Sequence, residues 1–339
     1  MVTVRSAQVD APNDKLYVTD RDVPDPGPGQ VRITVEASGI CHSDGAFIGD
    51  ALPGLTFPLT PGHEIAGRID ALGDGVTGRK VGDRVAVGWI GGYCTACRSC
   101  RHGDFVHCEN AQIPGLAYRG GYAESVVVPA TALARIPDGM SAVQAAPMAC
   151  AGVSVFGALR HSSVRPGDLV AIVGLGGLGH LGVQFAAKMG LDTVVVARGR
   201  DKEPLATELG ARHYIDATTQ DVSSELQNLG GARIVLATAA NSEAIADSLR
   251  GLGPNGELMV LGIDPEPMRI GPLDLIIPGR SVIGHPSGTP ADVEDTMAFA
   301  ELTGIKAMVE EMPLEQAPEA FDRMLANEAR FRIVLTTGA

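Results

Sequence analysis

Six cysteines are the residues of this 339-residue chain best suited to metal chemistry. Four of them form one cluster with the spacing C-x2-C-x2-C-x7-C: Cys94, Cys97, Cys100 and Cys108. Thiolate is a soft ligand that zinc favours, and four clustered thiolates make a closed tetrahedral site. The cluster lies in a glycine-containing loop with little periodicity, so a metal would have to fold this segment. The spacing predicts a structural zinc site rather than four free buried cysteines.

The other two cysteines, Cys41 and Cys150, lie far apart in sequence on either side of a Gly62-His63-Glu64 triplet. Two thiolates and one imidazole would leave one zinc coordination position open, which is the arrangement of a catalytic zinc. Each residue has an alternative when taken alone. Cys150 could be a small core residue of an apolar helix, His63 a turn residue, and Cys41 a residue buried in a sheet.

A glycine-rich turn, Gly174-Leu175-Gly176-Gly177-Leu178-Gly179, follows an apolar run and opens a helical pattern. In this context the glycines permit a tight turn, close approach of a pyrophosphate, and close packing of helix on strand. The N-terminus of the helix would then present free N–H groups to the anion. The pattern predicts a dinucleotide-binding site that includes Gly174, Gly176, Gly177, Leu178 and Gly179.

The end of the next strand distinguishes the two nicotinamide dinucleotides. NAD enzymes place an acidic residue there to bind the ribose 2′-hydroxyl. Here the position is Ala197, and Arg198, Arg200 and Lys202 follow it. Alanine cannot accept a hydrogen bond from the hydroxyl, whereas guanidinium groups suit a 2′-phosphate. We therefore predict NADP, with ordinary solvated charges as the alternative interpretation of these basic residues.

Composition places the chain among soluble globular enzymes, and its length favours two domains. The formal net charge of −13 argues against a nucleic-acid surface. Residues 1–14 lack the apolar core of a signal peptide, so we expect a reducing cytoplasm. The most apolar stretch, residues 142–159, is interrupted by Gln144, Pro147 and Gly152, which indicates a buried helical segment rather than a membrane span.

The periodicity of the sequence predicts the elements that position these residues. Up to about residue 140, short alternating runs such as 31–35 and 84–87 indicate strands separated by turns. From about residue 141 strands and helices alternate, with strands expected at 169–173, 193–196, 234–237 and 257–261 and helices at 180–189 and 202–209. Such alternation is typical of βαβ units in a doubly wound parallel sheet. The last 50 residues are expected to hold one helix, a short strand and a final strand at 332–335, packed on the first domain.

Taken together, the motifs resemble those of the zinc-containing alcohol dehydrogenases of the medium-chain dehydrogenase/reductase superfamily, over essentially the whole chain. The resemblance is carried by Gly39-Ile40-Cys41-His42-Ser43-Asp44, Pro61-Gly62-His63-Glu64 with Gly67, Gly82-Asp83-Arg84-Val85, the cysteine cluster, and Cys150 to Val155. It implies an α/β fold with a partly open, GroES-like β-barrel and a Rossmann domain, the cofactor lying between them. The zinc domain would cover residues 1–151, continued by 287–339, and the dinucleotide-binding domain residues 152–286.

The resemblance also implies roles for single residues. Cys41, His63 and Cys150 match the catalytic zinc ligands. Glu64 matches an acid beside the zinc, and Asp44 the carboxylate that steadies the ligand histidine. The remaining matches are Ser43 to the hydroxyl that takes the alcohol proton, His42 and Arg332 to cationic groups near the pyrophosphate, Ser154 to a hydroxyl near the nicotinamide, and Trp89 to a substrate-pocket aromatic. Core packing is an equal alternative for Trp89.

The implied activity is interconversion of alcohols with aldehydes or ketones, with two zinc ions per chain and an NADP cofactor. The chain would act as a homodimer or homotetramer on a small-molecule substrate, without a nucleic-acid or membrane partner. One departure opens an alternative: relatives with a full proton relay carry histidine three residues after the relay hydroxyl, and here that residue is Ala46. The same scaffold could then reduce a conjugated C=C or C=N bond. A cofactor-binding zinc protein without turnover is a third hypothesis. A second departure is the segment Gly284-His285-Pro286-Ser287-Gly288, in which His285 could line the cofactor or a subunit interface, with a solvated loop histidine as an equal alternative.

Overall fold

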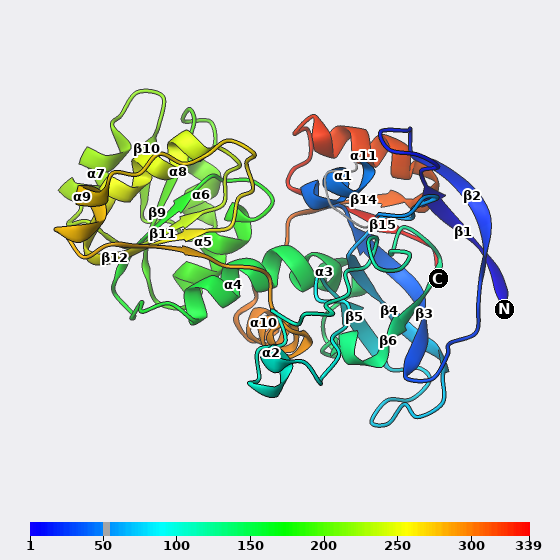
Figure 1. Ribbon diagram of the computed structural model, residues 1–339. Coiled ribbons are helices and arrows are strands. Elements are labelled where there is room, and N and C mark those ends of the chain that lie inside the picture. Colours follow the sequence, from blue (N-terminus) through cyan, green and yellow to red (C-terminus); the bar gives the residue numbers. More distant parts are fainter. Residues whose placement is uncertain (50–54) are drawn as a thin grey trace. The chain divides into compact units, whose positions relative to one another are not determined.

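The computed structural model describes residues 1–49 and 55–339. The chain divides into two compact units (Figure 1). Unit 1 comprises Met1–Val153, Ser287–Leu302 and Lys306–Ala339, and unit 2 comprises Ser154–Pro286 and Thr303–Ile305. The sequence-based domain boundaries were 151/152 and 286/287.

Unit 2 is built around six parallel strands. They are β8 (Leu169–Val173), β9 (Asp192–Ala197), β10 (His213–Asp216), β11 (Ala232–Ala237), β12 (Leu252–Val260) and β13 (Ser281–Gly284). Their spatial order is β10-β9-β8-β11-β12-β13, so the chain reverses direction across the sheet beside β8. This is the order of the dinucleotide-binding doubly wound fold, and the predicted α/β class is confirmed.

Helices connect these strands, as the alternating sequence pattern predicts (Figure 1). They are α4 (Val153–Arg160), α5 (Gly179–Lys188), α6 (Glu203–Glu208), α7 (Val222–Asn228), α8 (Ser242–Ser248) with the 3-10 turn Leu249–Gly251, and α9 (Pro272–Ile276). The central strands β8, β9 and β11 are mainly apolar, and residues such as Val170, Ile172, Val195 and Leu236 are fully buried. Parallel strands covered on both faces require this composition.

Unit 1 holds a two-stranded antiparallel ribbon, β1 (Val2–Gln8) with β2 (Tyr17–Val23), and a seven-stranded mixed sheet. The mixed sheet contains β3 (Gln30–Gly39), β4 (Glu64–Leu72), β5 (Arg84–Val87), β6 (Ser125–Pro129), β7 (Ala134–Arg135), β14 (Val309–Pro313) and β15 (Arg332–Thr336). Its order is β14-β15-β3-β4-β5-β7. Strand β6 lies off this path and pairs with residues 30–34 of β3, whereas β15 pairs with residues 37–39.

The helices of unit 1 are α1 (His42–Ile48), α2 (Arg98–Arg101), α3 (Ala142–Pro147), α10 (Pro290–Thr303) and α11 (Ala317–Leu325), with 3-10 turns at Ala130–Ala132 and Leu314–Gln316. The final 50 residues therefore contain two helices, α10 and α11, where the sequence pattern predicted one. The strands of this segment, β14 and β15, join the mixed sheet beside β3.

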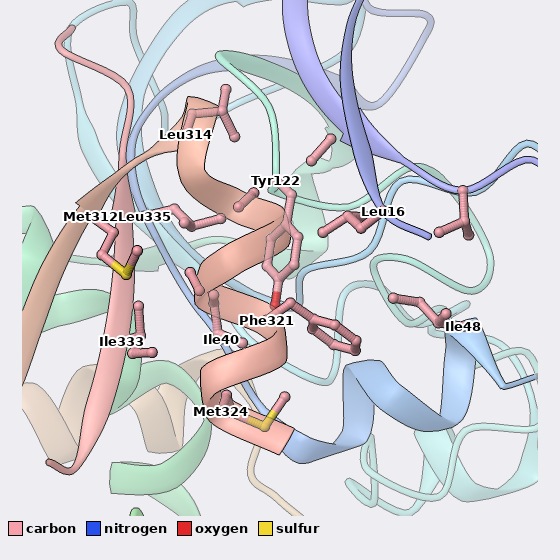
Figure 2. Close-up of a cluster of buried hydrophobic side chains, with 14 of the residues drawn as sticks. Leu16, Ile40, Ile48, Tyr122, Met312, Leu314, Phe321, Met324, Ile333 and Leu335 are labelled. Atoms are coloured by element: carbon pink, nitrogen blue, oxygen red, sulfur yellow. The ribbon is translucent and has the colours of Figure 1, made fainter. Parts of the chain in front are cut away.

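One buried cluster of unit 1 ties these C-terminal elements to the N-terminal ones. Helix α11 contributes Phe321 and Met324, which pack with Leu16, Ile40 and Tyr122 (Figure 2). Tyr122 is fully buried within the cluster, and its ring is the largest side chain there. The cluster therefore fixes the segment from Ile40 through α1, on which several of the candidate site residues lie.

The apolar stretch at 142–159 forms one continuous helical run, Ala142–Arg160. By length and composition alone it could cross a membrane, but 78% of its apolar window is buried within the fold. The run changes to a π-helix over Met148–Gly152, directly after Pro147. Proline lacks the N–H that the preceding turn would use, and a wider turn is one way for a helix to continue past it.

Candidate zinc centres and dinucleotide site

The antiparallel pairing of β3 with β4 brings Cys41 and His63 together. Gly39, near the end of β3, lies opposite Glu64, the first residue of β4, so the segments that flank this pair are neighbours. Cys41 stands immediately before α1, and His63 immediately before β4. Both side chains are buried, His63 completely.

Cys150 reaches the same point from the π-helical turn. Gly88, just after β5, packs against this turn so closely that an added Cβ would lie 2.1 Å from the carbonyl oxygen of Ala149. A larger residue at position 88 would push the turn away. As a result Cys150 Sγ lies 3.4 Å from His63 Nε2. The potential ligand atoms of Cys41, His63, Glu64 and Cys150 all lie within 4.8 Å of one another.

Asp44 fixes the orientation of the His63 ring. Its carboxylate is fully buried, and Oδ1 lies 2.9 Å from His63 Nδ1. Oδ1 also accepts from the backbone N–H of Gly62, at 3.2 Å. Oδ2 accepts from the Cys41 backbone at 3.0 Å and from the Tyr122 hydroxyl at 2.8 Å. A carboxylate beside Nδ1 favours the tautomer protonated there, which leaves the lone pair of Nε2 toward the two thiols.

Burial and neighbouring groups shift the pKa of each of these side chains. The hydrogen bond from Cys150 lowers the pKa of Cys41 well below its usual value, against the effect of burial, and the same contact raises the pKa of Cys150. Burial opposes protonation of His63, but the negative charges of Asp44 and Cys41 raise its pKa overall. Thiolate and imidazole in one buried cluster are the donor set that zinc prefers.

Glu64 and Arg332 form a buried ion pair that the sequence analysis did not connect. Burial raises the pKa of Glu64 to about 7, although the Arg332 guanidinium opposes this. Arg332 Nη2 contacts Glu64 Oε1, and both side chains are at most 5% exposed. Glu64 Oε2 has no hydrogen-bond partner among the described residues, and it faces the same cluster. An unpartnered buried carboxylate oxygen favours a cation nearby.

The structure places the other catalytic candidates on or beside α1. Ser43 is half-buried in the first turn, and His42 is exposed at its start. The half-buried Trp89 ring lies edge-on to the His63 ring with centroids 5.0 Å apart, and it stacks on Phe47 at 5.7 Å. Trp89 therefore lies beside the zinc-ligand candidate His63 and also packs against the hydrophobic core, and its role in a substrate pocket stays a prediction.

The four-cysteine cluster is arranged as a compact sulfur cage. The sulfur of Cys108 lies 3.6 Å from that of Cys94 and 3.9 Å from that of Cys97. Zn–S bonds of about 2.3 Å in a tetrahedron require sulfur–sulfur distances of about 3.8 Å, so the cage fits zinc. Backbone N–H groups of Cys94, Cys97 and Asn110 each donate to a cluster sulfur at 3.3 Å.

Backbone donors and burial act differently on the four thiols. Hydrogen bonds from the Ala96 and Cys97 backbone lower the pKa of Cys94 to about 6, whereas burial raises that of Cys100 to about 12. The short helix α2 is the only helix or strand between Val87 and Asn110 in this described segment. The lobe is otherwise held by turn hydrogen bonds and by the ring pair of Tyr93 and Phe105, so it has little regular structure apart from the cage. That a metal folds it stays a prediction.

The glycine-rich turn of unit 2 lies between β8 and α5, as predicted. Gly174 has a φ of +99°, and an added Cβ at Gly179 would lie 1.8 Å from the carbonyl oxygen of Gly174. At Gly176, by contrast, an added Cβ would meet nothing within 4 Å. The turn is therefore tightly packed on its inner side and open at Gly176, as a close approach of a pyrophosphate requires. Gly177 and Leu178 complete the turn.

The predicted ribose-side residues follow β9. Ala197 ends the strand and is buried, whereas Arg198 and Arg200 are exposed. Arg200 already forms a bidentate pair with Glu203, at 2.9 and 3.0 Å. Lys202 stands at the start of α6, and Ser154, four residues after Cys150, belongs to α4 of unit 2. Among the described residues, Arg198 is thus the guanidinium of this group that forms no ion pair with a carboxylate.

Comparison with known proteins identifies the family to which the chain belongs. Residues 27–138 match the family described as "Alcohol dehydrogenase GroES-like domain", and residues 177–301 match "Zinc-binding dehydrogenase". The chain is 43% identical to alcohol dehydrogenase notN of Aspergillus sp. (strain MF297-2), covering 95% of this chain and 94% of that protein. It is 36% identical to an alcohol dehydrogenase of Geobacillus stearothermophilus, covering 98% and 99%.

A solved structure has the same fold. The chain superposes on CAD from Helicobacter pylori, solved as a complex with NADP(H), with a TM-score of 0.88 and 26% identity. The match covers 99% of this chain and 98% of that one. The GroES-like and Rossmann-type domains expected from the sequence are therefore confirmed.

We expect Asp44→Asn to weaken zinc binding at the cluster of Cys41, His63 and Cys150 by about 10–100-fold, the usual effect of losing such a partner. In either orientation, the NH₂ group of the new amide would face two of the four donors from which the Asp44 carboxylate accepts hydrogen bonds. The measurement is zinc competition with a chromophoric chelator. Asp25→Asn is the control, because that side chain is 74% exposed. Equal affinities in the two variants would contradict this role of Asp44.

The two cysteine sites should respond differently to serine. Cys97→Ser should lower both zinc content and the midpoint of thermal unfolding, because its lobe has little regular structure apart from the cage. Cys150→Ser should remove turnover while leaving the unfolding midpoint close to that of the parent, since its turn is packed in the fold by other residues. Elemental analysis and differential scanning calorimetry measure the two effects. If Cys97→Ser only slowed turnover and Cys150→Ser unfolded the protein, the two assignments would be reversed.

Proposed function

Because the chain belongs to the zinc-type alcohol dehydrogenases of the medium-chain dehydrogenase/reductase superfamily, we propose that it interconverts a small alcohol with its aldehyde or ketone using NADP(H). It is an oxidoreductase of that family. The observation that carries the proposal is the cluster of Cys41, His63 and Cys150, beside which the fourth potential ligand, Glu64, is paired with Arg332. This donor set leaves a position for a substrate oxygen.

When bound, zinc supplies Lewis-acid polarisation of the substrate oxygen, and the nicotinamide supplies the hydride acceptor. The protein's own residues set the geometry. Cys41 and Cys150 provide thiolates, and Asp44 holds the proton of His63 on Nδ1 so that Nε2 is available. Glu64, held by Arg332, adds a buried carboxylate beside this cluster. We assign Ser43 as the group that accepts the alcohol proton, because it follows Cys41 by two residues and is half-buried.

A full proton relay would continue from Ser43 to a histidine three residues later on the same helix. This chain has no histidine at that position. Position 46 of α1 is a half-buried alanine, which can neither accept nor donate a proton. We propose that the cofactor ribose or water completes the transfer. The comparisons do not favour the alternative of reduction of a conjugated double bond, since the similar proteins are alcohol dehydrogenases. Two zinc ions per chain, one in each cysteine cluster, are part of the proposal.

The NADP preference is supported by residues after β9. Ala197 offers no carboxylate to the ribose, and the exposed Arg198 could pair with a 2′-phosphate. The related CAD of Helicobacter pylori was solved with NADP(H). We assign the turn from Gly174 to Gly179 to the pyrophosphate, with His42 as a further cation and Ser154 near the nicotinamide. Arg332 forms an ion pair with Glu64, so a contact between Arg332 and the pyrophosphate would be additional to that pair.

We also propose that the chain is a homodimer or homotetramer in the cytoplasm. Strand β13 ends the six-stranded sheet, and an edge strand offers unpaired backbone groups to a second copy. Large apolar side chains are exposed in the residues around it: Ile263, Leu273, Ile276, Ile277 and Ile283. Exposed large apolar side chains near an edge strand are typical of an interface. The six cysteines are all free thiols, which agrees with a reducing compartment.

The reaction is tested by following NADPH with an alcohol and with an enal. We expect oxidation of benzyl alcohol by NADP⁺ and reduction of cinnamaldehyde at its carbonyl, giving cinnamyl alcohol as the product identified by chromatography. The zinc-depleted protein should lose both activities and regain them with zinc, because the substrate oxygen needs the metal. A protein that reduces only the C=C bond of the enal would overturn the proposal.

For the cofactor, the double variant Ala197→Asp/Arg198→Ala should shift the ratio of kcat/KM values from NADP⁺ toward NAD⁺ by about tenfold or more. The new carboxylate can accept from a 2′-hydroxyl and repels a 2′-phosphate, and one charge-assisted contact is lost. Arg165→Ala, an exposed arginine elsewhere in unit 2, is the control and should leave the ratio unchanged. A parent protein that already prefers NAD⁺ would refute the NADP assignment.

A further inference from the structure

A hollow of about 620 Å³ on unit 1 gathers five basic side chains. Arg68 lies on β4, Arg79 and Lys80 in the turn before β5, Arg84 at the start of β5, and Arg135 on β7. The chain as a whole carries a net charge of −13, so such a concentration of cations is unusual for it. This hollow is formed by residues other than the zinc-ligand candidates, and the glycine-rich turn belongs to unit 2.

The strand register places two of these cations, Arg68 and Arg84, side by side on one face of the sheet. Arg68 lies directly opposite Arg84 in the β4–β5 pair, and Arg135 lies opposite Val85, the next residue of β5. Like charges opposite each other on neighbouring strands are destabilising. Arg84 donates to the carbonyl oxygens of Pro137, Asp138 and Met140, which orient the guanidinium but carry no net charge.

The carboxylates near the hollow offset only part of this charge. Glu36 pairs with Arg68 at 2.7 Å, and Glu294 lies 3.5 Å from Arg79. Within the described chain no carboxylate forms an ion pair with Lys80, Arg84 or Arg135.

Two acids also line the hollow. Asp83 accepts from the Lys80 backbone at 3.0 Å, and Asp138 is exposed on the rim. The hollow therefore retains three cationic groups that no ion pair neutralises.

We propose that this hollow binds an anion that carries two or more linked phosphate groups. Its volume falls within the range of small-ligand sites, about 300–1,000 Å³. Ile136 is the one apolar side chain among its lining residues, so the site offers charge rather than apolar contact. Arginine and lysine are the side chains best suited to phosphate oxygens. Lys80, Arg84 and Arg135 offer three separate donors to phosphate oxygens, and linked phosphate groups can contact more of these donors at once than a single phosphate or a carboxylate can.

The first test uses the protein with its parent sequence and pyrophosphate as the probe. A lysine-acylating reagent labels exposed amines, and mass spectrometry gives the rate at Lys80, with Lys188 at the end of α5 as the internal control. At fixed ionic strength, pyrophosphate should slow labelling of Lys80 several-fold and leave Lys188 unchanged, while equimolar orthophosphate has little effect. No protection of Lys80, equal protection of both lysines, or equal protection by orthophosphate would each overturn the proposal.

The second test measures affinity by isothermal titration calorimetry. Lys80→Gln/Arg135→Gln should weaken pyrophosphate binding by about tenfold or more, because two charge-assisted contacts are lost. Arg165→Gln/Lys188→Gln removes the same charges from exposed positions of unit 2 and should bind like the parent. Lys80 and Arg135 have exposed side chains, and dehydrogenase activity and zinc content should stay at the parent level in both variants.

Two results of the titration would reject the site. Equal affinities in the two double variants would place pyrophosphate elsewhere, for example at the glycine-rich turn. Binding that disappears at 0.15 M KCl would mean general charge screening, with a Debye length of about 8 Å, instead of a specific site. A parallel titration with ADP compares the parent with Lys80→Gln/Arg135→Gln, because ADP can also bind at the glycine-rich turn. ADP affinity that this variant does not change belongs to that turn. Where the variant does lose affinity, a loss similar to that for pyrophosphate indicates recognition of the diphosphate alone, and a larger loss indicates a nucleotide.

Discussion

The Asp44 carboxylate is the group on which the candidate catalytic site depends. A fully buried carboxylate is stable only when hydrogen-bond donors satisfy it, and here four donors converge on its two oxygens. They come from the end of β3, the segment before β4, and Tyr122. Each of the first two segments also carries a zinc-ligand candidate, Cys41 or His63. Satisfying this one charge therefore brings the two ligands to their positions and fixes the tautomer of the imidazole.

The hydrophobic core reaches the site through Tyr122. Its ring is packed in the cluster that α11 and β15 share with the N-terminal segment (Figure 2). Its hydroxyl donates a hydrogen bond to Asp44. Strand β15 also supplies Arg332, which pairs with Glu64 beside the thiols. The C-terminal 50 residues thus support the site through core packing around Tyr122 and through the Arg332–Glu64 ion pair, although they contain none of its proposed zinc ligands. Changes in this segment should act on the metal site by altering packing.

The sequence predicted those parts of the molecule whose signal is local. The parallel strands of unit 2 are short apolar runs, and the glycine-rich turn has a fixed spacing, so both could be placed without a structure. The cage of Cys94, Cys97, Cys100 and Cys108 is local as well. Cys41, His63 and Cys150 are separated by 22 and 87 residues, and only the resemblance to a family connected them.

Other features depend on side chains that meet only after folding. Nothing in the sequence marks Tyr122 as the partner of Asp44, because a tyrosine in a glycine-rich segment has many possible roles. Arg332 and Glu64 are 268 residues apart, and their pairing follows from the β15-β3-β4 strand order. The basic hollow likewise arises from the register of β4, β5 and β7. The second C-terminal helix, α11, was missed although the sequence does mark it: Ala317, Ala320, Phe321 and Met324 recur at the spacing of one helix face.

The most direct test of the account is the protonation of the His63 ring in the zinc-loaded protein. Long-range ¹H–¹⁵N correlation spectra of histidine-labelled protein distinguish a protonated ring nitrogen from one that binds a metal. We predict a proton on Nδ1, facing Asp44, and a metal-bound Nε2. A neutral ring with its proton on Nε2, or a spectrum that zinc does not change, would contradict the central claim.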